Sequence, residues 1–106
     1  MIKRIEPSAA ADALKRETNS ILLDVREQWE FDLAHIENSV FVPLRILSTK
    51  IDELKQYDKI YVICHHGFRS LSACEFLSQA GIREVYNVEG GIERWADEVD
   101  ISLKKY

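Results

Sequence analysis

The feature that most constrains this chain is a series of short apolar runs that alternate with segments of helical spacing. The runs predicted to be strands cover residues 2–5, 21–25, 40–42, 60–63 and 85–88. Helical segments are predicted from residue 7 through 14, from 29 to 36, in 44–55, in 70–80 and from 91 onward. Strands that alternate with helices predict an α/β fold with a parallel sheet.

The chain has 106 residues, and we expect them to form a single domain over residues 1–106. A hydrophobic fraction of 46% with 30% charged residues argues against disorder. The 14 basic and 18 acidic residues give a net charge of −4, which argues against nucleic acid as a partner.

No apolar run approaches the roughly 20 residues of a membrane span, and the first residues lack the apolar stretch of a signal peptide. Two cysteines are too few for a disulfide framework. We therefore expect a protein of the reducing cytoplasm with no membrane partner.

The segment after the fourth predicted strand carries the candidate chemistry. In a parallel α/β sheet, ligands bind beyond the carboxyl ends of the strands. Here Cys64 leaves the strand, a loop with Gly67 follows, and a helix is predicted from about Ser70. The loop N–H groups, the helix dipole and the charge of Arg69 all favour thiolate over thiol, so Cys64 is the candidate nucleophile. Gly67 permits a left-handed or crowded backbone.

The sequence resembles the single-domain rhodanese family of sulfurtransferases. The matching motifs are the loop 64–70, residues 22–31, His35-Ile36, Val42-Pro43-Leu44 and residues 88–95. The resemblance implies a five-stranded parallel sheet with helices on both faces, and a Cys64 that carries sulfur as a persulfide. It also implies an anion cradle, and therefore a substrate-binding loop, formed by His65, His66, Gly67, Phe68 and Arg69.

On this resemblance, small sulfur donors and acceptors are the expected partners, together with a protein persulfide donor or a protein thiol acceptor. No cofactor and no metal are implied. The family often has glycine where this chain has Ala34, and Gly-Ala where it has Asn38-Ser39. Asparagine tolerates left-handed geometry, so we expect the turn to be kept.

Two other functions fit parts of the pattern. Certain dual-specificity phosphatases and arsenate reductases share this fold, but their cradle has five residues between cysteine and arginine, whereas four separate Cys64 from Arg69. The shorter loop favours a single sulfur atom over a tetrahedral oxyanion. An inert interaction module is the third interpretation, and it usually lacks the cysteine that this chain retains.

Asp24 interrupts an apolar strand and needs buried partners, for which Arg26, Arg69 and loop amides are candidates. We expect Asp24 to brace the loop. Arg26 and Glu30 are four residues apart at a helix start and are predicted to pair.

The remaining candidates are interpreted structurally. Trp29 is predicted to be a core or packing aromatic, and Cys74 a core thiol rather than a partner of Cys64. His65 and His66 are adjacent, with no second Cys/His pair at zinc spacing, so no metal site is predicted.

Overall fold

The structure, a computed structural model, describes residues 2–106. Its centre is a sheet of five strands, which are β1 (Lys3–Ile5), β2 (Ser20–Asp24), β3 (Val40–Phe41), β4 (Lys59–Ile63) and β5 (Val85–Val88). The strand order is β1-β5-β4-β2-β3, and every neighbouring pair is parallel. The predicted parallel α/β fold is therefore confirmed.

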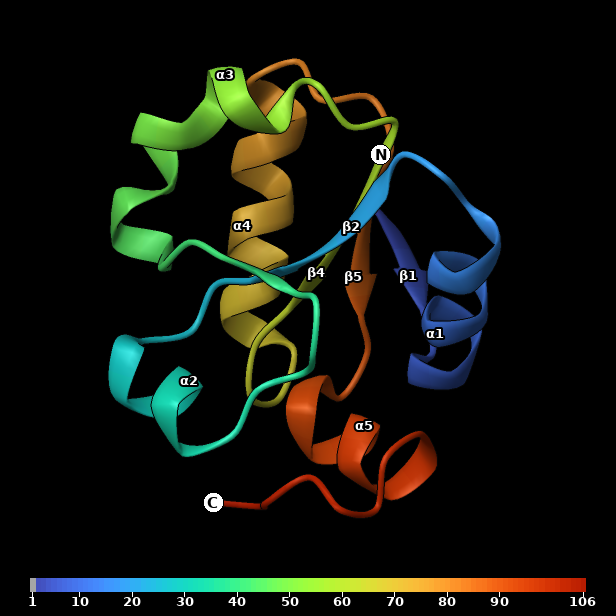
Figure 1. The fold of residues 1–106 in the computed structure, drawn as a ribbon. Helices are drawn as coiled ribbons and strands as arrows, with labels where there is room; N and C mark the ends of the chain where they lie inside the picture. The colour runs from blue at the N-terminus through green and yellow to red at the C-terminus, as the bar shows by residue number, and fades with distance from the viewer. Residues whose placement is uncertain (1) are drawn as a thin grey trace.

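Helical segments cover the sheet on both sides. They are α1 (Pro7–Arg16), α2 (Gln28–Leu33), η1 (Leu44–Lys50), α3 (Ile51–Leu54), α4 (Phe68–Gln79) and α5 (Gly91–Glu98). Figure 1 shows α4 with η1 and α3 on one side of the sheet, and α1 with α5 on the other. The expectation of helices on both faces is confirmed.

The two covered faces explain why the central strands are apolar throughout. Side chains of a strand alternate between faces. In β4, Ile60 and Val62 join the core under α4, while Tyr61 and Ile63 join the core under α1 and α5. All four side chains are at most 2% exposed. Cys64 follows in the same alternation and belongs to the core under α4.

Two positions adopt the left-handed backbone that the sequence predicts for them. Gly67 has a φ of 106° and immediately precedes α4, which begins at Phe68, two residues earlier than expected. Asn38 has a φ of 68°. The turn after α2 therefore keeps left-handed geometry with asparagine, as expected.

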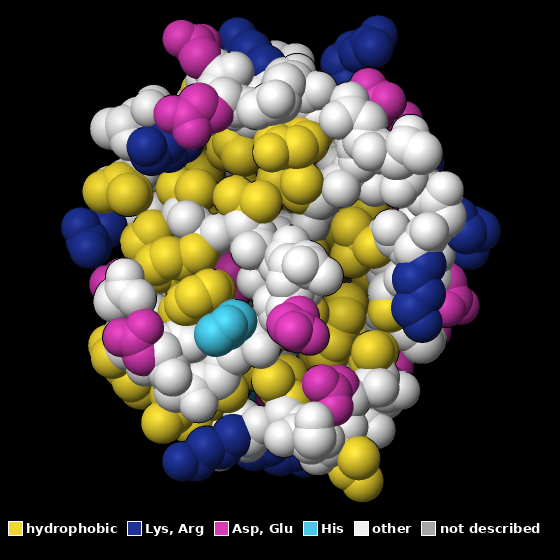
Figure 2. All heavy atoms as spheres, in the orientation of Figure 1, with side chains coloured by type: hydrophobic (Ala, Val, Ile, Leu, Met, Phe, Trp, Pro, Cys, Tyr) yellow, Lys and Arg dark blue, Asp and Glu magenta, His cyan; other side chains and the backbone are white. Residues whose placement is uncertain are grey.

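Hydrophobic side chains are visible on the surface over the η1–α3 side in Figure 2, where they lie among charged groups. Leu44, Ile46 and Ile51 are partly buried there and pack on the core. Within residues 2–106, no helix is both long enough and apolar enough to cross a membrane.

Candidate active site

The candidate site lies at the carboxyl edge of the sheet, where β4 ends. Figure 1 shows α2, α5 and the start of α4 gathered at this edge. Cys64 directly follows β4 and is 1% exposed. The sulfur is therefore almost completely covered by the surrounding chain.

Backbone donors surround the sulfur of Cys64. The Gly67 N–H lies 3.1 Å from Sγ, and the Ser70 N–H lies 3.3 Å from it. The first N–H groups of a helix have no partner inside the helix, so the first turn of α4 can direct one at the sulfur. The left-handed φ of Gly67 turns the loop into this position.

The start of α5 holds the loop in place from behind, and Gly91 leaves room for this contact. The carbonyl oxygen of Cys64 accepts the Ile92 N–H at 2.8 Å, and that of His65 accepts the Glu93 N–H at 3.2 Å. The loop carbonyls thus cap the start of α5. A Cβ on Gly91 would lie 2.3 Å from the Cys64 carbonyl oxygen, so only glycine fits there. This role is not among the sequence-based predictions, although the Gly90-Gly91 pair was its visible signal.

The guanidinium of Arg69 is bound by a carboxylate. Its two terminal nitrogens lie 2.6 and 2.8 Å from the two oxygens of Glu30, in a bidentate pair. These bonds raise the pKa of Arg69, and a charge on Cys64 adds to the effect. Arg69 is therefore within electrostatic reach of the sulfur, but its charge is already neutralised by Glu30.

Glu30 has three donors around its carboxylate. Burial alone would raise its pKa, yet bonds from Arg69, from the Glu27 backbone and from the Tyr106 hydroxyl lower it to about 2. The Glu30 residue is 3% exposed. The predicted partnership of Glu30 with Arg26 is wrong at the side-chain level, because Arg26 contacts only the backbone oxygen of Glu30.

Asp24 binds Arg26 instead, the first of its candidate partners. The two form a buried bidentate pair with distances of 2.9 and 2.7 Å. The Tyr106 hydroxyl accepts from Arg26 at 2.7 Å and donates to Glu30 at 2.9 Å. Asp24 is thus connected to Arg69 indirectly, through Arg26, Tyr106 and Glu30, and its role as a brace of the loop stays a prediction.

The loop side chains predicted to bind substrate lie at the surface or in a stack. Phe68 is 80% exposed. The His65 ring stacks between His66 and Tyr106, with centroid distances of 3.9 and 4.1 Å, and its Nε2 lies 3.2 Å from a Glu93 oxygen. His66 is exposed.

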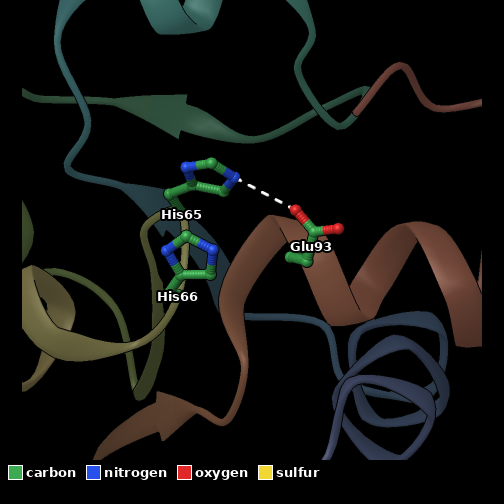
Figure 3. A group of neighbouring side chains, drawn as sticks. All are labelled: His65, His66 and Glu93. Carbon is green, nitrogen blue, oxygen red and sulfur yellow. Dashed lines mark hydrogen bonds and ion pairs between the residues drawn. The ribbon is translucent and has the colours of Figure 1, made fainter. Parts of the chain in front are cut away.

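Figure 3 shows a group of side chains at the site that resembles a metal site. The ligand atoms of His65, His66 and Glu93 lie within 4.8 Å of one another. An imidazole binds a metal along the in-plane lone pair of its nitrogen. The two rings stack on each other, with planes inclined by 20°, and the Nε2 of His65 already lies 3.2 Å from a Glu93 oxygen. The absence of a metal remains a prediction.

Comparison with known proteins identifies the family. The profile of the "Rhodanese-like domain" family matches residues 6–98. The chain belongs to the rhodanese-like family.

Curated relatives and a solved structure agree with this assignment. "Thiosulfate sulfurtransferase GlpE" of Pseudomonas syringae is 39% identical over 88% of this chain and 86% of its own length. "Putative sulfur carrier protein YrkF" of Bacillus subtilis is 35% identical, and the match spans 89% of this chain but only 53% of that protein. The crystal structure of a rhodanese-related protein from Thermoplasma volcanium has a TM-score of 0.79 at 39% identity, covering 92% of this chain and 93% of the other.

Two further expectations concern residues near the rhodanese-like loop. Cys74 is fully buried, and burial raises the pKa of its thiol to about 12, as befits a core residue. Trp29 is 63% exposed, so of its two predicted places, in the core or packed on a neighbour, the core is excluded. It packs instead on Tyr106 edge to face, with ring centroids 5.9 Å apart, at the surface beside the site.

Proposed function

We propose that this chain is a sulfurtransferase in which Cys64 carries sulfur as a persulfide between a donor and an acceptor. The observation that carries the proposal is the sulfur of Cys64 at the end of β4, with the N–H groups of Gly67 and Ser70 directed at it. The relative named as a thiosulfate sulfurtransferase supports thiosulfate as a donor.

The proposed reaction is a double displacement. The Cys64 thiolate attacks the sulfane sulfur of thiosulfate, an S–S bond forms to Sγ, and the S–S bond of thiosulfate breaks as sulfite leaves with the electron pair. An acceptor such as cyanide or a thiol then attacks the outer sulfur, and Cys64 leaves as thiolate. No external oxidant or reductant is needed.

The loop and the first turn of α4 are suited to hold the negative outer sulfur. Their N–H groups and the helix dipole supply partial positive charge in a buried place. Because the Arg69 charge is neutralised by Glu30, we assign this stabilisation mainly to the backbone, with Arg69 contributing at a distance.

The burial of Cys64 also favours sulfur over a phosphoryl group as the group transferred. Cys64 is 1% exposed, and a terminal sulfur atom reaches it with less displacement of the loop than a tetrahedral phosphate would need. A protein persulfide donor or a protein thiol acceptor is a further expected partner, supported by the relative named as a putative sulfur carrier.

The test is the intact mass of the protein after incubation with thiosulfate. We expect wild type and Cys74→Ser to gain one sulfur atom, which cyanide then removes, and Cys64→Ser to gain none. Labelling that persists in Cys64→Ser would refute the assignment. Turnover of p-nitrophenyl phosphate that is lost in Cys64→Ser would favour the phosphatase interpretation instead.

A further inference from the structure

A buried polar pair lies beside the reactive sulfur and has no part in the reaction above. Ser70, on the first turn of α4, is 0% exposed, and Asn87, on β5, is 6% exposed. Burying a hydroxyl and an amide among apolar side chains is costly unless both are hydrogen-bonded. The bonds that these two side chains make therefore indicate what the pair does.

The pair forms a chain of hydrogen bonds that begins at the sulfur. The Cys64 thiol donates to Ser70 Oγ at 3.3 Å, and the Ser70 hydroxyl donates to Asn87 Oδ1 at 2.5 Å. The Asn87 amide nitrogen in turn donates to the Gly67 carbonyl oxygen at 3.1 Å. That last bond fixes which end of the amide faces Ser70, and it also braces the residue whose N–H points at the sulfur.

The single proton of the Ser70 hydroxyl has two acceptors within reach. While Cys64 is a thiol, its proton occupies the Ser70 oxygen, and the Ser70 proton points to Asn87. When the thiol proton is lost to solvent, the sulfur becomes an acceptor. The hydroxyl can then rotate about its C–O bond and donate to the sulfur, adding a third donor to the two N–H groups.

We propose that Ser70 is a catalytic residue whose hydroxyl alternates between Asn87 Oδ1 and the sulfur of Cys64, and that Asn87 is a positioning residue that competes with the thiolate for this proton. The role rests on the proposed function of Cys64 as the sulfur carrier. Through this competition the site stabilises the thiolate when it is released after each transfer, without adding a fixed charge.

The first arm of the test is the pH dependence of alkylation of Cys64 by iodoacetamide, followed on the tryptic peptide of residues 60–69. This peptide excludes Cys74. Loss of a hydrogen bond to a charged group should move the midpoint of the profile in Ser70→Ala to higher pH by about one unit. Ser72→Ala, an exposed serine on the same helix, is the matched control and should not move it. An unmoved midpoint in folded Ser70→Ala overturns the proposal.

The second arm tests Asn87 with a double-mutant cycle. Leucine has nearly the shape of asparagine without its polar groups, so Asn87→Leu removes the acceptor that competes with the sulfur for the Ser70 proton. We expect the midpoint to fall in the wild-type background and not in the Ser70→Ala background. If it rises equally in both backgrounds, Asn87 only braces Gly67, and the competition is refuted.

Alkylation does not require sulfur transfer, so the two proposals fail separately. If thiosulfate loads no sulfur on Cys64 while both midpoint shifts are seen, the proposed function fails. The Ser70 hydroxyl would then still be a group that stabilises the Cys64 thiolate. If thiosulfate loads Cys64 normally and neither shift is seen, the proposed function stands and the role of Ser70 and Asn87 is wrong.

Discussion

Two neighbouring regions at the carboxyl edge of the sheet handle charge in opposite ways. Around Cys64 the polar partners are neutral, namely two backbone N–H groups that donate to the sulfur and a serine hydroxyl that accepts from the thiol. A few residues away, the charged groups form a network of their own, which consists of Asp24, Arg26, Glu30, Arg69 and the neutral Tyr106. We call the first region the sulfur cradle and the second the charge network.

The difference shows where the site obtains its preference for an anion. Two acids and two arginines in the charge network cancel, so no full positive charge remains for the sulfur. The N–H groups close to Cys64 then stabilise the negative sulfur. They are already oriented toward it, so no free energy is spent on reorienting them when the charge develops. The charge network is left to fix the positions of β2, α2 and the chain around Tyr106.

The largest effect is expected from removing one partner of the buried pair in the charge network. Arg26→Met leaves Asp24 as an unpaired buried charge, and we expect the free energy of unfolding to fall by about 3–5 kcal/mol. Chemical denaturation measures this loss. The exposed pair of Arg45 with Glu27 is the matched control, and Arg45→Met should show no measurable change. Equal losses in both variants would mean that burial of the Asp24 pair contributes nothing.

The sulfur cradle is tested by a substitution that touches only the backbone behind it. In Gly91→Ala the new Cβ meets the carbonyl oxygens of Cys64 and His65 at 2.3 and 2.4 Å, so the loop must shift. We expect a loss of about 3 kcal/mol in stability and at least a roughly tenfold fall in the rate of sulfur transfer. Denaturation and a thiosulfate–cyanide assay measure the two effects.

Gly81→Ala is the control for backbone strain alone. Gly81 follows the far end of α4 and has a φ of 100°, but a Cβ added there would meet nothing within 4 Å. We expect a stability loss of about 1 kcal/mol and unchanged sulfur transfer. A Gly91→Ala protein with normal transfer would show that the contact of α5 with the loop does not shape the sulfur cradle.

The two regions also differ in how far the sequence could predict them. The sulfur cradle is local, because a strand end, a glycine and a helix start within seven residues define it, and these were predicted. The charge network joins Arg69 to Glu30 and Tyr106, which lie 39 residues before and 37 after it in the chain. The i,i+4 rule suggested that Arg26 pairs with Glu30, but the buried Asp24 needed a cation and took Arg26.

A similar limit explains what the sequence left open in the fold. Apolar runs predicted all five strands, because burial on both faces needs apolar side chains at successive positions. The same runs do not encode which strand neighbours which. Trp29 shows a second limit, since the pattern left open whether this aromatic lies in the core or packs at the surface, and α2 places it at the surface.

The last prediction uses pH to measure how strongly the charge network stabilises the ionised form of Glu30. Burial opposes ionisation of Glu30, but hydrogen bonds from Arg69, Glu27 and Tyr106 outweigh it and lower the pKa from 4.5 to about 2 in the folded protein. A lowered folded-state pKa means stability that is present above pH 4.5 and is lost as the pH falls toward 2. That change corresponds to about 3 kcal/mol. We therefore expect the stability advantage of wild type over Glu30→Gln to shrink by about this amount between roughly pH 5 and 2, as measured by denaturation at each pH.

The control for this pH series is Glu53→Gln, which alters an exposed carboxylate paired only with Lys50. Its stability difference from wild type should stay constant over the same range, because an exposed pair is screened by water. If Glu30→Gln behaves like this control, Arg69 does not hold Glu30 as a carboxylate. The Arg69 charge would then be free to act on the sulfur, and the contrast between a neutral sulfur cradle and a self-neutralised charge network would be lost.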